Sequence, residues 1–354
     1  MEIKKDAYYK IVNRNSGLVA DVAGKSKGNS AHLEQLDWHG EPFQQWLLYP
    51  LDGGRYAIIN RNSGLVADVA GKSTSNSARL EQLDWHGEPF QQWLLYQTND
   101  QGYYKIVNQN SGLVADVAGK SKGNSAHLEQ LDDQNESFQY WSFDEVESIT
   151  LPSVETKPLP IAPQYKSLND YLPDSTEPVV TAYTLLPCIM VNDNNWSADK
   201  KMQHSPYYML TKTQYWKKID SHTFAPHAQY TSETKYGMSQ TDQESMTRNT
   251  NISVKADAGF SFKAVSIGIS KSVTKELQVS KSTTTTQMTE QTNSETIANP
   301  NNYTVAWTKY ALVTEYTLKR GDGIRVSDPW TVINKNDERE SYWPLDAPLN
   351  KAQI

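Results

Sequence analysis

The chain has 354 residues, of which 37% are hydrophobic and 21% are charged, and its formal net charge is −7. This composition is typical of a folded protein of about two domains rather than of a disordered chain. The acidic excess, without a stripe of Lys and Arg, argues against a nucleic-acid partner. Cys188 is the single cysteine, so no internal disulfide can form.

The first residues, Met1–Asp6, lack the apolar core of a secretory signal, and no run approaches the ~18 apolar residues of a membrane-spanning helix. We therefore expect a protein without a signal peptide. It would be made in the cytoplasm, where it can be stored as an inclusion, and released to act outside the cell. Any membrane role would have to come from β-structure.

The N-terminal half contains one sequence unit three times. The unit Tyr9–Gly24 recurs as Tyr56–Gly71 and as Tyr104–Gly119 with few changes. The spacing of about 47 residues is within the range of supersecondary repeats. Each copy closes on a Gln-x-Trp triplet: Gln44/Trp46, Gln91/Trp93 and Gln139/Trp141.

Each unit is predicted to form four short strands. In the first copy these are residues 9–12, 18–22, 31–36 and 44–49, separated by turns rich in Gly, Asn, Ser and Pro. Three such units give the twelve strands of a β-trefoil, and we expect this domain to span residues 1–145. Helix–turn–helix repeats are the alternative, but the frequent turn residues argue against them.

The repeats resemble the ricin B-chain lectin family through Tyr-x-Ile-x-Asn-x-x-Ser-Gly, the Ala-Asp-Val that follows, and Gln-x-Trp. The resemblance covers residues 7–145 and implies that the Trp of Gln-x-Trp lies in the core. It also implies that the second-strand Asp accepts hydrogen bonds from sugar hydroxyls and that a ring after the third strand stacks on the sugar. The expected carbohydrate-binding residues are Asp21, Trp38, His39, Gln44, Asp68, Trp85, His86, Gln91 and Asp116.

Two departures from the family pattern affect these sites. Phe43, Phe90 and Phe138 precede the Gln of each triplet, where sugar-binding members often carry Asn. In the third copy, Asp133-Gln134-Asn135 replaces the Trp-His-Gly of the other two, so the third site is expected to be degenerate. A structural role is the alternative, in which the aspartates cap turns and Trp38 packs against the barrel.

Residues 146–178 contain six prolines, which interrupt any regular strand or helix. This composition predicts a semi-rigid connector that can also wrap around either domain.

The stretch 246–298 shows the period-2 alternation of long β-strands. Apolar residues occupy every second position up to Ala264, after which the phase shifts by one. Two segments of this length could cross a bilayer as tilted strands in a barrel shared by several subunits. The predicted membrane-insertion hairpin comprises Ile252, Val254, Phe260, Phe262, Val265, Ile267, Ile269 and Val273. An ordinary sheet with one wet face is the alternative.

In its long, Ser/Thr-rich strands around an amphipathic hairpin, the region 179–345 resembles aerolysin-type β-pore-forming toxins. Trefoil lectins fused to such domains occur among fungal haemolytic lectins and bacterial insecticidal toxins. The expected fold class is therefore all-β: a β-trefoil followed by an elongated aerolysin-like β-sheet domain over residues 179–354.

These features predict a glycan-binding β-pore-forming toxin. Its expected partners are cell-surface glycans of galactose or N-acetylgalactosamine type, the target-cell membrane, and further copies of the chain on assembly. We expect no enzymatic activity, cofactor or metal, because no placed carboxylate pair or metal-ligand spacing is present. The alternatives are a non-toxic agglutinin with a structural second domain and a carbohydrate-binding module attached to an unrecognised enzyme.

Overall fold

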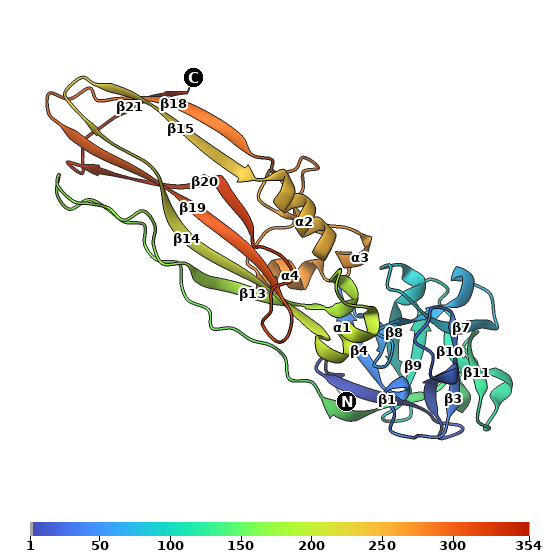
Figure 1. Cartoon of the computed structure of the whole chain (residues 1–354). Coiled ribbons are helices and arrows are strands. Elements are labelled where there is room, and N and C mark those ends of the chain that lie inside the picture. Colours follow the sequence, from blue (N-terminus) through green and yellow to red (C-terminus); the bar gives the residue numbers. More distant parts are fainter. Residues whose placement is uncertain (1–2, 354) are drawn as a thin grey trace.

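The computed structural model describes residues 3–353 and shows an elongated, mostly β-stranded molecule (Figure 1). A rounded unit built from the three repeats forms one end. A long twisted sheet extends away from it, and the C-terminus lies near the far tip of that sheet. The predicted fold class, a β-trefoil followed by an elongated β-sheet domain, is confirmed.

The twelve repeat strands form the trefoil, four from each copy. In every copy the first and fourth strands contribute to the barrel, and the second and third pair as a hairpin. The strands are β1 (Ala7–Asn13), β2 (Val19–Val22), β3 (Ala31–Leu36), β4 (Trp46–Leu51), β5 (Arg55–Asn60), β6 (Val66–Val69), β7 (Ala78–Leu83), β8 (Trp93–Gln97), β9 (Tyr104–Asn108), β10 (Val114–Val117), β11 (Ala126–Leu131) and β12 (Trp141–Ser148). Single 3₁₀ turns join them at Ala23–Lys25, Pro42–Gln44, Ala70–Lys72, Pro89–Gln91, Ala118–Lys120 and Ser137–Gln139.

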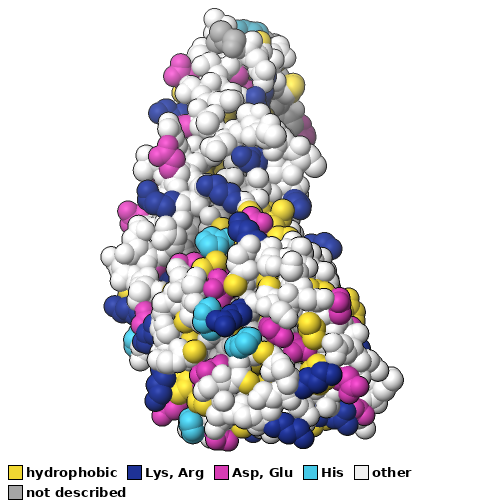
Figure 2. All heavy atoms as spheres, turned by 90° about the vertical axis from the view of Figure 1, so that its right-hand side faces the viewer, with side chains coloured by type: hydrophobic (Ala, Val, Ile, Leu, Met, Phe, Trp, Pro, Cys, Tyr) yellow, Lys and Arg dark blue, Asp and Glu magenta, His cyan; other side chains and the backbone are white. Residues whose placement is uncertain are grey.

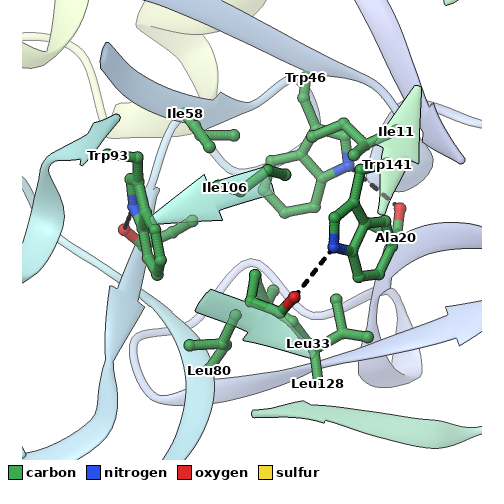
Figure 3. Close-up of a pocket in the computed structure, with 12 residues that line it drawn as sticks. Ile11, Ala20, Leu33, Trp46, Ile58, Leu80, Trp93, Ile106, Leu128 and Trp141 are labelled. Atoms are coloured by element: carbon green, nitrogen blue, oxygen red, sulfur yellow. Dashed lines mark hydrogen bonds between the residues drawn. The ribbon is translucent and has the colours of Figure 1, made fainter. Parts of the chain in front are cut away.

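The trefoil core is three-fold repetitive and centres on the Gln-x-Trp tryptophans. Trp46, Trp93 and Trp141 are each about 1% exposed, and each indole donates a hydrogen bond of 3.0–3.1 Å to the carbonyl of the second-strand Ala. Four apolar residues from each repeat surround a void of about 30 Å³ (Figure 3). A void of this size, lined by apolar atoms, is a packing feature of the core rather than a ligand site.

The second part is built on one antiparallel sheet in the order β13-β14-β19-β20-β15-β18-β21. Its longest ladder pairs β14 with β19 from Met209↔Lys319 to Phe224↔Val305. The strands are β13 (Val179–Pro187), β14 (Tyr207–Phe224), β15 (Gln229–Met238), β18 (Gln291–Ala298), β19 (Val305–Lys319), β20 (Trp330–Trp343) and β21 (Asn350–Gln353). A 3₁₀ turn, Cys188–Met190, and helix α1 (Ala198–His204) lie between β13 and β14.

The proline-rich segment after β12 runs along the long sheet rather than hanging free (Figure 1). Tyr165 is 7% exposed and its hydroxyl lies 2.7 Å from Thr308 Oγ1 on β19. Leu172 packs in the same apolar cluster with Trp216 and Tyr310. The segment therefore acts as a strap that covers part of the sheet.

The apolar core of the second part continues into the trefoil. One cluster joins Leu47, Tyr49, Ala57 and other residues of the first and second repeats to residues of α1, β13, β14 and the segment 252–277. Apolar burial of this kind resists relative movement of two domains more than a polar contact would. The two parts therefore meet through a continuous hydrophobic interface.

The segment 248–282, predicted to form a membrane-insertion hairpin, does not form two long strands in this conformation. Residues 240–276 instead form α2 (Gln240–Thr250), β16 (Ile252–Val254), β17 (Phe260–Phe262), α3 (Ala264–Ile267) and α4 (Ser270–Glu276). The first alternating run turns back on itself at Asp257–Gly259, so Ile252 pairs with Phe262. In the second run, Val265, Ile269, Val273 and Leu277 are four residues apart, which also satisfies a helix.

Candidate carbohydrate and membrane-insertion sites

The three second-strand aspartates are buried rather than open to a ligand. Asp21, Asp68 and Asp116 are each 1% exposed, and one carboxylate oxygen of each lacks a hydrogen-bond partner among residues 3–353. Burial raises the pKa of each to about 7, and a hydrogen bond accepted from the Gln of the triplet offsets part of that rise.

The Gln of each triplet holds the preceding loop in shape. In the first repeat, Gln44 Nε2 donates to Asp37 O at 2.8 Å, and its Oε1 accepts from His39 N at 2.7 Å. Gln91 makes the same pair of bonds with Asp84 and His86. Both glutamines are fully buried, so their observed role is to position the loops that carry Trp38 and Trp85. They do not contact solvent as predicted sugar ligands would.

The first-repeat loop is open. Trp38 is 37% exposed and His39 is exposed, as a sugar-stacking surface requires. Lys10 Nζ lies 5.7 Å from the centre of the Trp38 ring and 3.3 Å from Asp144. The buried Asp21 does not share this surface with the ring. Over the trefoil end, basic and acidic side chains are interspersed with small apolar patches (Figure 2).

The second-repeat loop is closed by the second part of the chain. Trp85 is 8% exposed and its Nε1 donates a 2.8 Å hydrogen bond to the main-chain carbonyl of Val265. Gly87, at φ +78°, lies so close to Ala264 that a Cβ there would be 2.2 Å from the Ala264 carbonyl oxygen. The prediction that Trp85 stacks on a sugar is therefore wrong for this conformation, although His86 remains exposed.

A residue difference between the repeats explains why the second copy packs against the second part of the chain. The first strand carries Lys10 in the first copy and Lys105 in the third, but Ala57 in the second. Ala57 is fully buried in the interface, where a lysine ammonium would lose its hydration. This exchange was visible in the sequence as a departure from the repeat, and it marks the face that binds the second part.

The carboxylate of Asp52 in the trefoil also caps helix α4 of the second part. Asp52 Oδ2 accepts hydrogen bonds of 3.1 Å from Ser270 Oγ and from Lys271 N, at the start of α4. Asp52 N donates to Gly268 O at 2.6 Å. A carboxylate at a helix N-terminus satisfies free N–H groups and complements the helix dipole. No local sequence pattern indicates this role of Asp52, because its partners lie more than 200 residues away in the chain.

The predicted insertion residues fall into two groups. Ile252, Val254, Phe260, Ile269 and Val273 are at most 2% exposed and lie in the shared core, with Phe262 and Val265 packed against it. Ile267 differs, since it is 48% exposed. Most of the predicted insertion residues are therefore buried together in the shared core. Within 264–276 this happens because the chain is helical, so that residues four apart lie on the same face.

Fold and site together define a two-part, mostly β-stranded protein, in which the second repeat of a β-trefoil packs against an amphipathic segment of an elongated β-sheet domain. Residues 2–83 and 89–159 match the family described as ricin-type beta-trefoil lectin domain-like. Residues 179–344 match the family described as Insecticidal Crystal Toxin, P42. The chain is thus similar to ricin-type β-trefoil lectin domains in its first part and to this insecticidal crystal toxin family in its second.

Known relatives match about half of the chain. The binary larvicide subunit BinA of Lysinibacillus sphaericus is 34% identical over 198 residues, which cover 55% of this chain and 53% of BinA. Subunit BinB of the same organism is 34% identical over 182 residues, 51% of this chain and 40% of BinB. The chain thus matches about half the length of these relatives or less.

The crystal structure of Cry35Ab1 has the same overall fold. It superposes with a TM-score of 0.82 at 21% identity, covering 97% of this chain and 91% of that one. The two matched family models describe a lectin-type domain and a toxin. Within residues 3–353, no helix combines the length and hydrophobicity needed to cross a membrane.

Proposed function

We propose that this protein is a glycan-directed β-pore-forming toxin of the insecticidal type. The trefoil captures surface carbohydrate on a target cell, and the second part assembles with further copies and inserts strands from 252–277 into the membrane. In this proposal residues 1–145 are the receptor-binding unit, 146–178 the connector and 179–354 the pore-forming unit. The protein acts outside the cell that makes it.

The observation that carries the proposal is how the segment 252–277 is attached. Strands β16 and β17 form a two-stranded sheet of their own, apart from the seven-stranded sheet. The segment is held by side-chain packing in the shared core and by its hydrogen bonds to the trefoil. Main-chain hydrogen bonds join it to residues 280–288, and side chains of Thr184 on β13 and Lys212 on β14 bond its C-terminal end. It can therefore leave without breaking the long β14–β19–β20 ladders.

Once released, the segment has the pattern that a transmembrane hairpin needs. Read as strands, its apolar positions alternate with Ser, Thr and Lys, so one face suits lipid and the other a water-filled lumen. Its backbone groups would be satisfied in hydrocarbon only in a closed barrel, which requires several copies of the chain. Capture by glycans concentrates those copies on one surface and favours assembly.

A reversible disulfide between trefoil and segment tests the proposal. A Cβ on Gly268 would lie 3.7 Å from Leu51 Cβ, which is the separation of a normal disulfide. The variant Leu51→Cys/Gly268→Cys should therefore form this bond on oxidation. Cys188 is 1% exposed and does not compete. Dye release from liposomes and cultured insect cells, with and without protease treatment, is then measured for the oxidised and reduced protein.

We expect no release from the oxidised variant and restored release after reduction, with glycan binding the same in both states. Each single cysteine variant serves as the matched control. Equal release from both redox states would remove this segment from the pore. A wild-type protein that binds glycans and agglutinates cells without any release would instead be a lectin with a structural second domain.

A further inference from the structure

An open hollow lies where β8, the last strand of the second repeat, meets the third repeat, and the second part of the chain does not cover it. It measures about 560 Å³ and lies between β8, β9, the turn from β9 to the start of β10, and the loop after β11. The lining side chains on which the argument rests are Tyr96, Gln97, Lys105, Gln109, Asp133 and Asn135. Asp116 and Gln139, the third copies of the predicted sugar ligands, do not line it.

The pseudo-three-fold symmetry of the trefoil relates this hollow to the interface of the second repeat. Tyr96 corresponds to Tyr49, Lys105 to Ala57, and Asp133 to Trp85. Tyr49 and Ala57 are buried under the second part of the chain, whereas Tyr96 is 53% exposed. The same recessed face is therefore filled by protein in one repeat and open in another.

The polar groups of the hollow are held in place by one another. Lys105 Nζ donates to Asp133 Oδ2 at 2.6 Å and to Asn135 Oδ1 at 2.9 Å, and the Tyr140 hydroxyl donates to Asn135 Oδ1 at 2.8 Å. Asn135 N donates to Asp133 Oδ1 at 2.8 Å. Fixed groups of this kind bind without a large ordering cost.

A residue substitution in the loop after β11 adds a side-chain amide to this site. Asn135 has φ +56°, at the loop position where the other repeats carry Gly40 and Gly87. Asn is among the residues that tolerate this left-handed conformation. The third repeat thus keeps the loop shape of the others and gains a side chain that carries both a donor and an acceptor.

The chemistry of the hollow suits an uncharged polyhydroxylated ligand. The half-exposed Tyr96 ring offers an apolar surface for the C–H face of a pyranose. The carboxylate of Asp133, 45% exposed, and the amides of Asn135, Gln97 and Gln109 offer acceptors and donors for hydroxyls. The Lys105–Asp133 ion pair leaves no net charge between these two residues, which disfavours an acidic sugar.

We propose that this hollow binds a neutral saccharide, with the sugar ring against Tyr96 and its hydroxyls on Asp133 and Asn135. This inference rests on the proposed function, the capture of glycans by the trefoil, and specifies where on the trefoil the glycan binds. Trp85 is buried and Asp21 is 1% exposed, whereas here an accessible ring and an accessible carboxylate share one concave surface. The sugar is then bound beside the third repeat, which has Asp133 where the other two repeats have a loop tryptophan.

Saturation-transfer NMR of the full chain tests this site. The probes are methyl β-galactoside, N-acetylgalactosamine, methyl α-mannoside and methyl α-glucoside, with N-acetylneuraminic acid as the charged comparison. Tyr96→Ala and Asp133→Ala should each weaken the binding of the best neutral sugar about ten-fold or more, and Tyr96→Phe should retain it. The matched control, Tyr303→Ala, removes an exposed ring from the second part and should leave binding unchanged, while Trp38→Ala tests the predicted first-repeat site.

Each variant is checked by its melting temperature, which should not change because both side chains are exposed. Loss of binding in Trp38→Ala with full binding in Tyr96→Ala would overturn the hollow as the site while leaving glycan capture intact. Preferred binding of N-acetylneuraminic acid would overturn the neutral-sugar assignment. A wild-type chain that binds none of these sugars would overturn this site and the carbohydrate part of the proposed function, but not pore formation measured by dye release.

Discussion

Trp85 Nε1 donates a hydrogen bond of 2.8 Å to Val265 O, joining the second trefoil repeat to the start of α3. The sequence from Leu80 to Tyr96 is identical to that from Leu33 to Tyr49, so Trp38 occupies the same loop in the first repeat. Trp38 is 37% exposed and Trp85 is 8% exposed. One loop therefore has two environments in a single molecule, and this provides an internal control for mutagenesis.

Replacing Trp85 by Phe should destabilise the protein, whereas replacing Trp38 by Phe should not. Trp85→Phe keeps most of the buried ring but leaves the Val265 carbonyl without its donor, which should cost about 1–3 kcal/mol. Trp38→Phe changes an exposed side chain and should stay within about 0.5 kcal/mol. Urea unfolding curves measure both. Equal losses in the two variants would mean that the contact with Val265 contributes little.

Exchanging residues between equivalent first-strand positions should reveal the docking face. Ala57→Lys would bury an ammonium group in the shared core and should cost more than about 3 kcal/mol, or detach the second part from the trefoil. The reciprocal change, Lys10→Ala, removes a partly exposed ion pair and should cost at most about 1 kcal/mol. Thermal unfolding and limited proteolysis distinguish the two. A stable Ala57→Lys variant with wild-type protease resistance would contradict the burial of this face.

The three buried aspartates should make stability fall as pH rises from about 4 to 7. In the folded protein the pKa of Asp21 is raised to about 7, so the folded state holds a proton that the unfolded chain releases near pH 4. The carboxylate formed at higher pH is penalised by burial. Asp21→Asn should therefore gain stability over the wild type across this range, on the order of 1–4 kcal/mol, and the gain should level off above pH 7.

Urea midpoints at several pH values, compared for wild type, Asp21→Asn and the triple variant with Asp68→Asn and Asp116→Asn, measure this effect. The triple variant should show the flattest pH dependence. A gain that is the same at pH 4 and pH 8 would show that these carboxyls titrate at their ordinary pKa.

Ile267→Asp should separate folding from membrane insertion. Ile267 is 48% exposed, so the charge should change the free energy of unfolding by no more than about 0.5 kcal/mol. On the lipid face of an inserted strand, the same charge should reduce dye release several-fold. Phe260→Asp is the wrong variant for this purpose, because Phe260 is fully buried and the soluble protein would unfold. Ile267→Val is the control and should release dye like the wild type.

The sequence by itself determined the trefoil and the β-rich character of the second part. Three copies of four short strands, each with its own turn residues and Gln-x-Trp triplet, leave few other ways to bury the repeated apolar positions. Turn chemistry and strand alternation act over a few residues, so the printed sequence contains all the information that they need. Trp46, Trp93 and Trp141 were predicted as core residues and are each about 1% exposed.

Only the tertiary structure decided which of the equivalent side chains in the three repeats are exposed and which are buried under the second part. Tyr49 and Tyr96 each end the same sequence, Leu33–Tyr49 and Leu80–Tyr96, yet one is 5% exposed and the other 53%. The alternation after Ala264 could likewise not distinguish strand from helix, since residues 265, 269, 273 and 277 satisfy both periods. Packing of those residues against β13 and the trefoil selected the helices. The physical reason is the same in each case: burial is set by contacts between residues far apart in the chain, which no local pattern encodes.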